Sequence, residues 1–273
     1  MGEVVALFNR FGNGLFDGLL WLCRPLGERG QLLWVSLVLG AVVASIFRGL
    51  VNRPRLEGAR DRLRAALLEV WFFRHDPGVV LSAEQDLFAA NLVYLHTFFF
   101  PLAMAMMAAM PLLIQTYDRW GLQGGAPGKA LLLTAELAPG RDWRVQLAWA
   151  RGQGAISPPV REPARGRLVW RVEPAVAGTL LLNLKSGNTG QSEEVPLFVG
   201  EVGEGIGTLR SKSLYLQLLH PRMAGLGADS PFTRIEVDYP ESEPHWLIWL
   251  TVGSLVAAGV ANALAEMLWP RRV

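Results

Sequence analysis

The residues of this chain that have chemistry to offer are polar side chains set within long apolar stretches. Hydroxyl, amide, imidazole and guanidinium groups interrupt these stretches, with a flexible methionine among them: Ser45, Arg48, Asn91, Tyr94, His96, Thr97, Met104 and Asn262. An unpaired polar group in apolar surroundings costs free energy, so each group either bonds to a neighbouring helix or lines a binding surface. Their chemistry is hydrogen bonding and charge stabilisation rather than bond cleavage.

Catalytic motifs and metal-ligand spacings are missing from the sequence. It has no phosphate-binding loop, no zinc-protease helix motif and no nucleophile elbow. Cys23 is the only cysteine, which excludes an intramolecular disulfide, and the four histidines are scattered. The glycine-rich segment 200–207 lies among β-type segments with no helix after it, which favours a turn over a dinucleotide loop. We therefore expect no enzyme activity, cofactor, metal site or nucleic-acid partner.

Three apolar stretches must position the polar residues. Residues 32–51 carry one charge, Arg48, whereas 92–115 and 246–265 carry none apart from the titratable His96. Each is near the roughly 20 residues that a helix needs to cross the hydrocarbon of a bilayer. We predict transmembrane helices over 32–51, 91–115 and 245–268. Buried helices of a soluble core are the alternative, but such helices seldom run this long without a fixed charge.

The distribution of arginine predicts an orientation in the membrane. The segment from Arg48 to Ala90 holds seven arginines, Arg48 included, and two more lie at the end of the chain. Short arginine-rich flanks stay in the cytoplasm, and long exported domains do not influence orientation. We therefore predict a bacterial inner-membrane protein whose N-terminus is outside. The hairpin 52–90 and the tail 269–273 would then be cytoplasmic, and residues 116–244 exported.

The segment 52–90 has the pattern of a helical hairpin. Leu56, Leu63 and Val70 are seven residues apart, and each is followed three positions later by a member of a second row: Ala59, Ala66 and Phe73. Two such rows form the apolar seam of a coiled-coil-like helix. Ser82 with Gln85 predicts the start of the second helix. A short basic hairpin is not stable alone, so it would rest on lipid headgroups or serve as a docking surface.

Small residues recur every fourth position in two of the apolar stretches. They are Ser36, Gly40 and Ala44 in the first and Gly253, Ala257 and Ala261 in the third. This spacing lets helix backbones approach closely. Packing within this protein is favoured over packing against a partner.

The N-terminal segment 1–31 has one apolar face. Its members are Val4, Phe8, Phe11, Leu15, Leu19 and Leu22, whereas Asn9, Arg10, Asn13 and Asp17 fall elsewhere. This pattern predicts an amphipathic helix that lies in the membrane interface. A poorly formed additional span is the alternative.

Residues 116–244 have the pattern of a β domain. Alternation of apolar and polar residues predicts strands over 130–137, 143–149, 167–172, 179–184, 213–219 and 232–239, with a weaker candidate at 195–199. Short strands separated by Gly, Pro, Asn and Asp clusters suggest an all-β sandwich of immunoglobulin-like size. The expected fold class is thus a membrane α-helical protein with an inserted β-sandwich.

The layout resembles the YidC/Oxa superfamily of membrane protein insertases, and is closest to its short three-span members. The resemblance is carried by VVASIFRGLVNRPRLEGARDRLRAALLEV from Val42, FFFPLAMAMMAAMPLLIQ from Phe98 and the final WLIWLTVGSLVAAGVANAL. It covers about half of the chain. The chain also looks like a group of uncharacterised bacterial membrane proteins with this hairpin-plus-sandwich plan. The inserted β domain departs from the superfamily, whose large exported domain usually comes earlier in the chain.

The resemblance implies a polar groove, open to the cytoplasm and to lipid, that receives hydrophobic segments of nascent membrane proteins. Arg48 is the only arginine within a predicted span, and it lies near the cytoplasmic end rather than at mid-membrane. Snorkelling of Arg48 to the headgroups is an alternative role. A second hypothesis from a different class is a non-enzymatic adaptor, whose exported sandwich binds a partner or another subunit of a membrane complex. Lipid is the expected partner in both.

Overall fold

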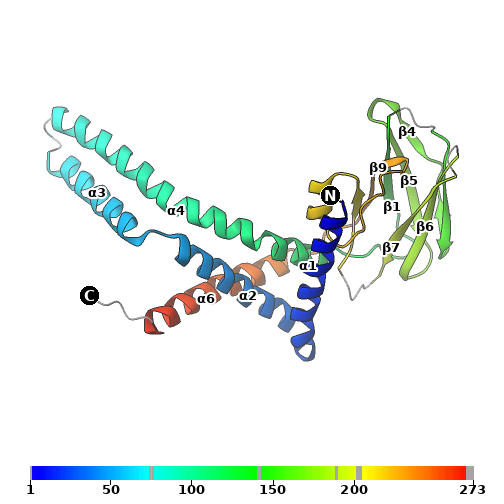
Figure 1. The fold of residues 1–273 in the computed structure, drawn as a ribbon, viewed down its shortest axis with the longest axis horizontal. Helices are drawn as coiled ribbons and strands as arrows, with labels where there is room; N and C mark the ends of the chain where they lie inside the picture. Colours follow the sequence, from blue (N-terminus) through cyan, green and yellow to red (C-terminus); the bar gives the residue numbers. More distant parts are fainter. Residues whose placement is uncertain are drawn as a thin grey trace. The chain divides into compact units, whose positions relative to one another are not determined.

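The computed structural model describes residues 2–73, 75, 77–139, 143–187, 190–200 and 205–268. Helices occupy the two ends of this part of the chain and strands occupy its middle (Figure 1). The chain divides into two compact units. A helical unit comprises 32–110 and 249–273, and a β unit comprises 1–31 and 111–248. The predicted cytoplasmic tail, 269–273, lies outside the described residues.

Three helices are long and apolar enough to cross a membrane. They are α2 (Gly27–Leu50), α4 (Pro77–Trp120) and α6 (His245–Leu268). The prediction of three apolar helices of membrane length is therefore confirmed. Only 17 % of the most apolar window of α4, and 17 % of that of α6, is buried inside the protein. Most of their apolar surface is thus left for lipid or for a partner.

The predicted hairpin is formed by α3 (Arg53–Phe72) and the first turns of α4. Asn52 caps α3, since its side chain accepts a hydrogen bond from the Arg55 amide at 3.1 Å. Alanines form the buried seam, at positions 59 and 66 of α3 and 83 and 90 of α4. Their small side chains allow close approach of the two helices. Phe73 was expected to join the seam but is 54 % exposed.

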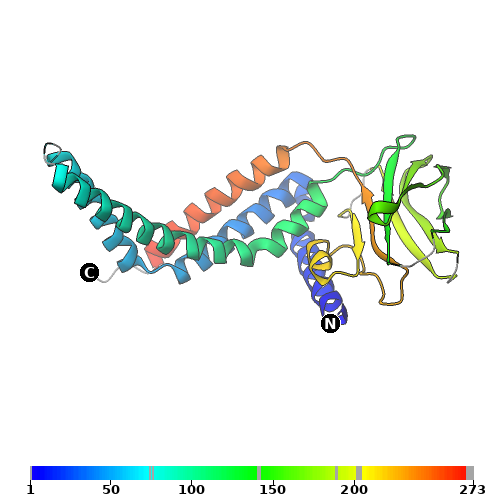
Figure 2. The same ribbon diagram turned by 90° about the horizontal axis from the view of Figure 1, so that it is seen from above.

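The second helix of the hairpin begins at Pro77 rather than at the predicted Ser82. Because α4 has 44 residues and each rises about 1.5 Å, it is about 66 Å long, twice the hydrocarbon thickness of a bilayer. It continues as one helix through Pro101 and Pro111. One continuous helix therefore supplies both half of the hairpin and the second apolar segment, as Figure 2 shows.

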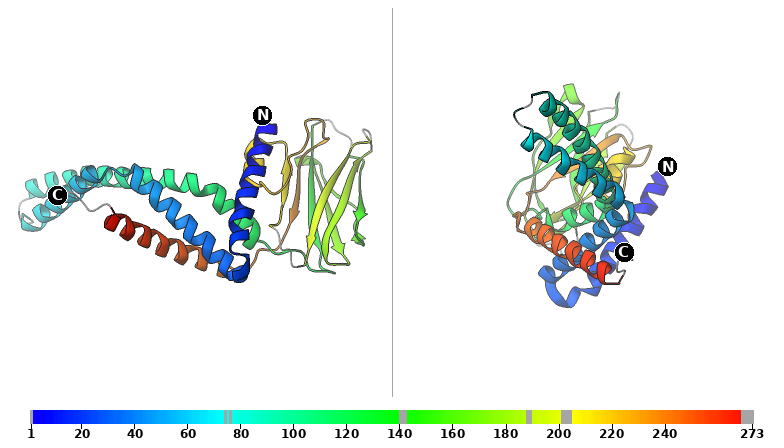
Figure 3. Two further views of the ribbon diagram at one scale, coloured as in Figure 1. Left: turned by 60° about the horizontal axis from the view of Figure 1, so that its bottom comes forward. Right: turned by 90° about the vertical axis from the view of Figure 1, so that its left-hand side faces the viewer.

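The β unit contains two antiparallel sheets. Their strands are β1 (Leu131–Leu137), β2 (Val145–Arg151), β3 (Gly154–Ile156), β4 (Val160–Glu162), β5 (Arg167–Pro174), β6 (Gly178–Ser186), β7 (Ser192–Val199), β8 (Leu209–Ser211) and β9 (Phe232–Asp238). One sheet has the order β3-β5-β1-β9-β8, with β4 paired to β5, and the other has the order β2-β6-β7. The strands lie together in every view (Figure 3).

One apolar core joins the two sheets. Alternate residues of β1, β5 and β9 point inward, as do those of β6 and β7, so that Trp170, Leu182 and Leu197 are almost fully buried. Tyr239 adds a polar link, because its hydroxyl oxygen accepts a hydrogen bond from the Phe198 amide of β7 at 3.0 Å. Burial raises the pKa of Tyr239 above its ordinary value, and this hydrogen bond opposes the rise.

One predicted strand is wrong. The segment 213–219 forms a short helix, α5 (Leu214–Leu219), and not a strand. The spacing of its leucines suits both the two-residue period of a strand and the 3.6-residue period of a helix. Leucine and glutamine are also good helix formers. Gln217 is buried and its side chain donates a hydrogen bond to the Ser211 carbonyl at 2.9 Å. The three-residue strands β3, β4 and β8 had no counterpart in the sequence prediction.

Candidate functional site

A polar pocket opens in the helical unit where four helices come near one another. We call it the Arg48 pocket; its volume is about 310 Å³. It is lined by Phe47, Arg48, Val51, Arg53, Leu56, Glu57, Arg60, Tyr94 and Asn262. These residues come from the end of α2, from α3, from α4 and from α6. Three arginines against one glutamate make its lining cationic.

Arg48 is held in this pocket by α6. Its Nη1 donates hydrogen bonds to the main-chain oxygen of Asn262 at 3.1 Å and to the side-chain oxygen at 3.3 Å. Arg48 also lies in the last turn of α2, where the helix dipole favours a cation. No carboxylate among the described residues lies within ion-pair distance of Arg48. The guanidinium is therefore positioned by the neutral main-chain and side-chain oxygens of Asn262.

An aromatic cluster forms the apolar wall beside the pocket. Phe47 of α2 meets Phe98 of α4 edge to face, with ring centroids 5.5 Å apart. Tyr94 stacks on Phe98 one turn away, at 6.4 Å. Tyr94 is half-buried, so one side of its ring packs on this wall while the residue also lines the pocket. The pocket thus combines a fixed cation with an apolar surface.

His96 and Thr97 line a different pocket, which we call the hairpin groove. It lies between α3 and α4, has a volume of about 720 Å³, and is lined by Pro54, Arg55, Gly58, Ala59, Arg62, Ala90, Leu92, Val93, His96 and Thr97. The Thr97 hydroxyl donates to the Val93 carbonyl at 2.8 Å, so its donor is satisfied within the helix. His96 stacks on Phe100 at 6.0 Å.

The remaining candidates lie outside both pockets. Ser45 is exposed and donates to the Ala41 carbonyl at 2.7 Å. Asn91 is exposed, and Met104 is 40 % exposed. The structure therefore brings together Arg48, Tyr94 and Asn262 from the predicted set and separates the other five residues from them.

Three charged residues of the Arg48 pocket were not among the predicted site residues. Arg53, Glu57 and Arg60 come from the first two turns of α3, directly after the first apolar stretch. Their spacing of three to four residues places them on one face of a helix that begins beside Arg48. That spacing in the sequence was the signal from which these three residues could have been predicted to share one site.

The small residues predicted for helix packing lie at the crossing of α2 and α6. A Cβ added at Gly40 would come within 2.8 Å of the Ala257 Cβ and would overlap the Ser254 carbonyl. One added at Gly253 would come within 2.6 Å of the Ser36 Cβ. Ala44 and Ala261 are half-buried further along the same helices. Close approach of the two backbones at this crossing brings Asn262 of α6 to Arg48 of α2.

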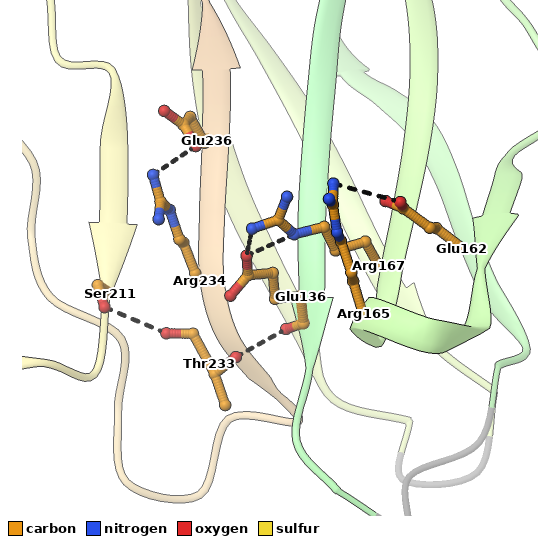
Figure 4. Close-up of polar contacts among 8 residues, drawn as sticks. All are labelled: Glu136, Glu162, Arg165, Arg167, Ser211, Thr233, Arg234 and Glu236. Carbon is orange, nitrogen blue, oxygen red and sulfur yellow. Dashed lines mark hydrogen bonds and ion pairs between the residues drawn. The ribbon is translucent and has the colours of Figure 1, made fainter.

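The β unit holds a pocket of about 830 Å³, lined by residues of 27–31, 119–127, 200 and 206, and its larger sheet presents a charged outer face. Figure 4 shows Glu136 of β1 bound to Arg167 of β5 at 2.7 Å, with Arg234 and Glu236 of β9 paired at the same distance. Opposite charges neutralise one another between β1 and β5 and along β9, which is typical of a solvated sheet face. Among the described residues no cluster of His, Cys, Asp and Glu could hold a metal ion.

Comparison with known proteins adds no family to this geometry. A scan against protein-family models finds no match to the chain, and searches of curated proteins and of solved structures find none either.

Proposed function

We propose that the chain is an integral membrane protein of insertase or chaperone type, related to the YidC/Oxa superfamily. In this proposal the Arg48 pocket receives the polar end of a hydrophobic segment from a nascent membrane protein. One observation carries it: a fixed cation faces a pocket among helices whose apolar surfaces are left uncovered.

A polar segment loses its contacts with water when it moves into a bilayer, and this costs free energy. Between apolar helices the dielectric is low, so the attraction between a guanidinium and an acidic or carbonyl group exceeds its value in water. Arg48 is already oriented by Asn262, so its side chain would lose little further conformational entropy on binding a ligand. The aromatic wall and the exposed methionines Met104, Met106 and Met107 would accommodate varied apolar side chains.

The same proposal includes an orientation in a bacterial inner membrane. The beginning of α2, the end of α4 and the beginning of α6 all belong to the β unit. Three helices that alternate in direction would have these ends on one side. The arginine-rich hairpin would then be cytoplasmic by the positive-inside rule, and the β unit would be exported.

Labelling of single cysteines in intact cells tests the orientation. In a Cys23→Ser background, a membrane-impermeant maleimide should modify Lys129→Cys and should leave Arg64→Cys unmodified until the cells are lysed. Both positions are exposed, so burial in the protein does not limit either reaction. The reverse pattern would overturn the orientation.

Photo-crosslinking in cells tests the function. A crosslinker at Tyr94 should capture nascent membrane proteins, whereas one at Asn91, on the same helix but outside the pocket, should capture several-fold less. Arg48→Leu should reduce capture at Tyr94, and Arg48→Lys, which keeps the charge, should reduce it less. A crosslinker at the exposed Tyr215 of the β unit reports on the adaptor alternative. If Tyr215 captures one stable partner while Tyr94 yields only lipid adducts, the insertase proposal fails and the adaptor stands.

A further inference from the structure

The N-terminal helix α1 (Gly2–Leu22) uses its polar face to bind the rest of the β unit, at α5 and the turn that follows it. Asn9 is buried, and its side-chain amide donates to the Gln217 carbonyl of α5 at 2.8 Å. One turn on, the Asn13 amide donates to the Pro221 carbonyl at 3.0 Å and its oxygen accepts from the Gln115 side chain. Figures 1 and 3 show α1 beside α5. The side chains that would otherwise face water therefore bond to protein.

An ion pair and an aromatic contact complete this interface. The Asp17 carboxylate lies 3.1 Å from Nη2 of Arg222, in the turn that follows α5. The guanidinium of Arg222 also lies over the ring of Phe16, 5.8 Å from its centre. Phe16 is buried and meets Trp120, at the end of α4, edge to face. The contacts involve residues on three successive turns of α1, so the helix packs against the α5 region along this length.

The opposite face of α1 is apolar and uncovered. Its members are between 53 % and 70 % exposed: Val4, Leu7, Phe8, Phe11, Leu15 and Leu22. A helix on a water-soluble domain has the reverse arrangement, with its apolar face on the core and its polar face in solvent. A continuous apolar stripe of this size marks a surface that is covered by something else.

The connection to α2 indicates that the cover is lipid. Only Cys23 and the short 3-10 turn Arg24–Leu26 separate α1 from α2, which is apolar and long enough to cross a membrane. The reversal is tight, with Gly27 at a φ of 70° and the Gln31 amide donating to the Leu20 carbonyl at 3.5 Å. The end of α1 must therefore lie where α2 enters the hydrocarbon. Trp21, 71 % exposed, suits the headgroup boundary there.

The polar contacts also exclude the alternative that α1 is an additional span. Gln217 and Pro221 bond to the middle of α1, so a spanning α1 would carry α5 and its neighbouring loops into the hydrocarbon. Backbone groups of such loops cannot be satisfied there. An in-plane position leaves the β unit in water and the apolar face in the acyl region.

We propose that α1 is an in-plane lipid anchor that clamps the inserted β unit to the surface of the membrane leaflet from which α2 departs. The inference rests on the proposed membrane location of α2 but not on insertase activity. The α5 end of the β unit then lies against the headgroups. The strands and α5 are thereby held at the membrane by α1 in addition to the chain connections through α4 and α6.

Spin-label accessibility tests the lipid contact. The full-length chain with Cys23→Ser is labelled singly at Phe11→Cys or Leu15→Cys and placed in phosphatidylcholine and phosphatidylglycerol vesicles. Labels at both sites should be relaxed more by oxygen than by an aqueous nickel chelate. Leu255→Cys on the exposed apolar surface of α6 serves as the lipid reference and Ser192→Cys on the β unit as the water reference. A nickel preference would place the face in water and overturn the proposal. Low access to both reagents would indicate a second copy or a protein partner and would also overturn it.

The clamp itself is tested by a distance between two labels within the β unit, at Leu15→Cys and Lys129→Cys. Asn9→Ala with Asn13→Ala should broaden the distance distribution, because both hydrogen bonds to the α5 region are lost. Asp17→Asn, a milder variant, should broaden it less, and Arg10→Ala on the exposed surface of the same helix should leave it unchanged. An unchanged distribution in the Asn9/Asn13 variant would refute the clamp. Absence of nascent-protein capture at Tyr94 when Arg48 is intact, with α1 still in lipid, would refute the insertase proposal alone.

Discussion

The close crossing of α2 and α6 makes one glycine far more sensitive to substitution than another on the same helix. Gly253→Ala adds a Cβ that would lie 2.6 Å from the Ser36 Cβ and 3.2 Å from its hydroxyl oxygen. Carbon atoms in contact need about 3.5–4.0 Å, so the helices must separate by about 1 Å. Overpacking of this kind costs about 1–3 kcal/mol. The separation also weakens the hydrogen bond from Ser36 to the Trp249 carbonyl, already 3.4 Å long.

Gly259→Ala is the matched control, because a Cβ there meets nothing within 4 Å. Alanine is favoured over glycine in a helix by about 1 kcal/mol, so the control should be neutral or slightly stabilised. Because both variants gain the same helix propensity, they should differ by the overpacking cost alone, about 1–3 kcal/mol in the free energy of unfolding. The measurement is reversible unfolding in mixed micelles of rising dodecyl sulfate content, followed by tryptophan fluorescence.

A second-site change tests the cause of the difference. Ser36→Gly removes the atoms that a Cβ at position 253 would strike, so the double variant should recover much of the loss. Gly40→Ala offers no such rescue, because its nearest neighbour is the main-chain carbonyl of Ser254. Equal stability of Gly253→Ala and Gly259→Ala would refute the packing of α2 against α6, and so would a failure of Ser36→Gly to restore stability.

Three predictions concern the β unit, each measured by thermal unfolding of the full-length protein in detergent. Burial lowers the pKa of His220 below its ordinary 6.5, so the folded state binds fewer protons than the unfolded state. The free energy of unfolding should therefore fall as the pH drops below about 6.5. In His220→Gln the contribution of this side chain to the fall should be absent. Arg210 of β8 lies 3.1 Å from the carboxylate of Glu193 of β7 and so links the two sheets. Arg210→Ala should therefore cost about 1.5–3 kcal/mol. Arg165→Ala, which removes an exposed ion pair, should cost under about 1 kcal/mol. Equal losses would refute the link. Tyr239→Phe should cost about 1–2 kcal/mol by removing the acceptor for the half-buried Phe198 amide, whereas the exposed Tyr215→Phe should be neutral.

The apolar helices and most strands could be predicted because their signals are local. The length of an uncharged run decides whether a helix can span a bilayer. The helices α2 and α6 match their predicted spans within five residues, whereas α4 contains the second predicted span and extends beyond it at both ends. Alternation with period two gave β1, β5, β6 and β9 within a few residues. The prediction of a strand over 213–219 was wrong because the leucines there fit both the two-residue period of a strand and the 3.6-residue period of a helix. The helical form of this segment is stabilised by Gln217, which bonds to Ser211 and to Asn9, and neither partner can be read from the segment itself.

The candidate site could be predicted only in part. Polar residues within apolar runs were a sufficient signal for Arg48, Tyr94 and Asn262, which share one pocket. His96 lies two residues after Tyr94, about 200° round the helix, so it faces the hairpin groove instead. Sequence defines the faces of a helix, but the packing of its neighbours decides which face is open and which pocket it lines.

The N-terminal helix shows where this limit lies. Periodicity alone located an apolar face and a polar face on residues 3–22, because side-chain direction follows from the 3.6-residue turn. Which face would bind protein was not determined by that pattern, since an apolar face usually packs on a core. The decision came from residues more than 200 positions away. The carbonyls of Gln217 and Pro221 and the guanidinium of Arg222 give Asn9, Asn13 and Asp17 their partners, so the polar face docks and the apolar face stays free.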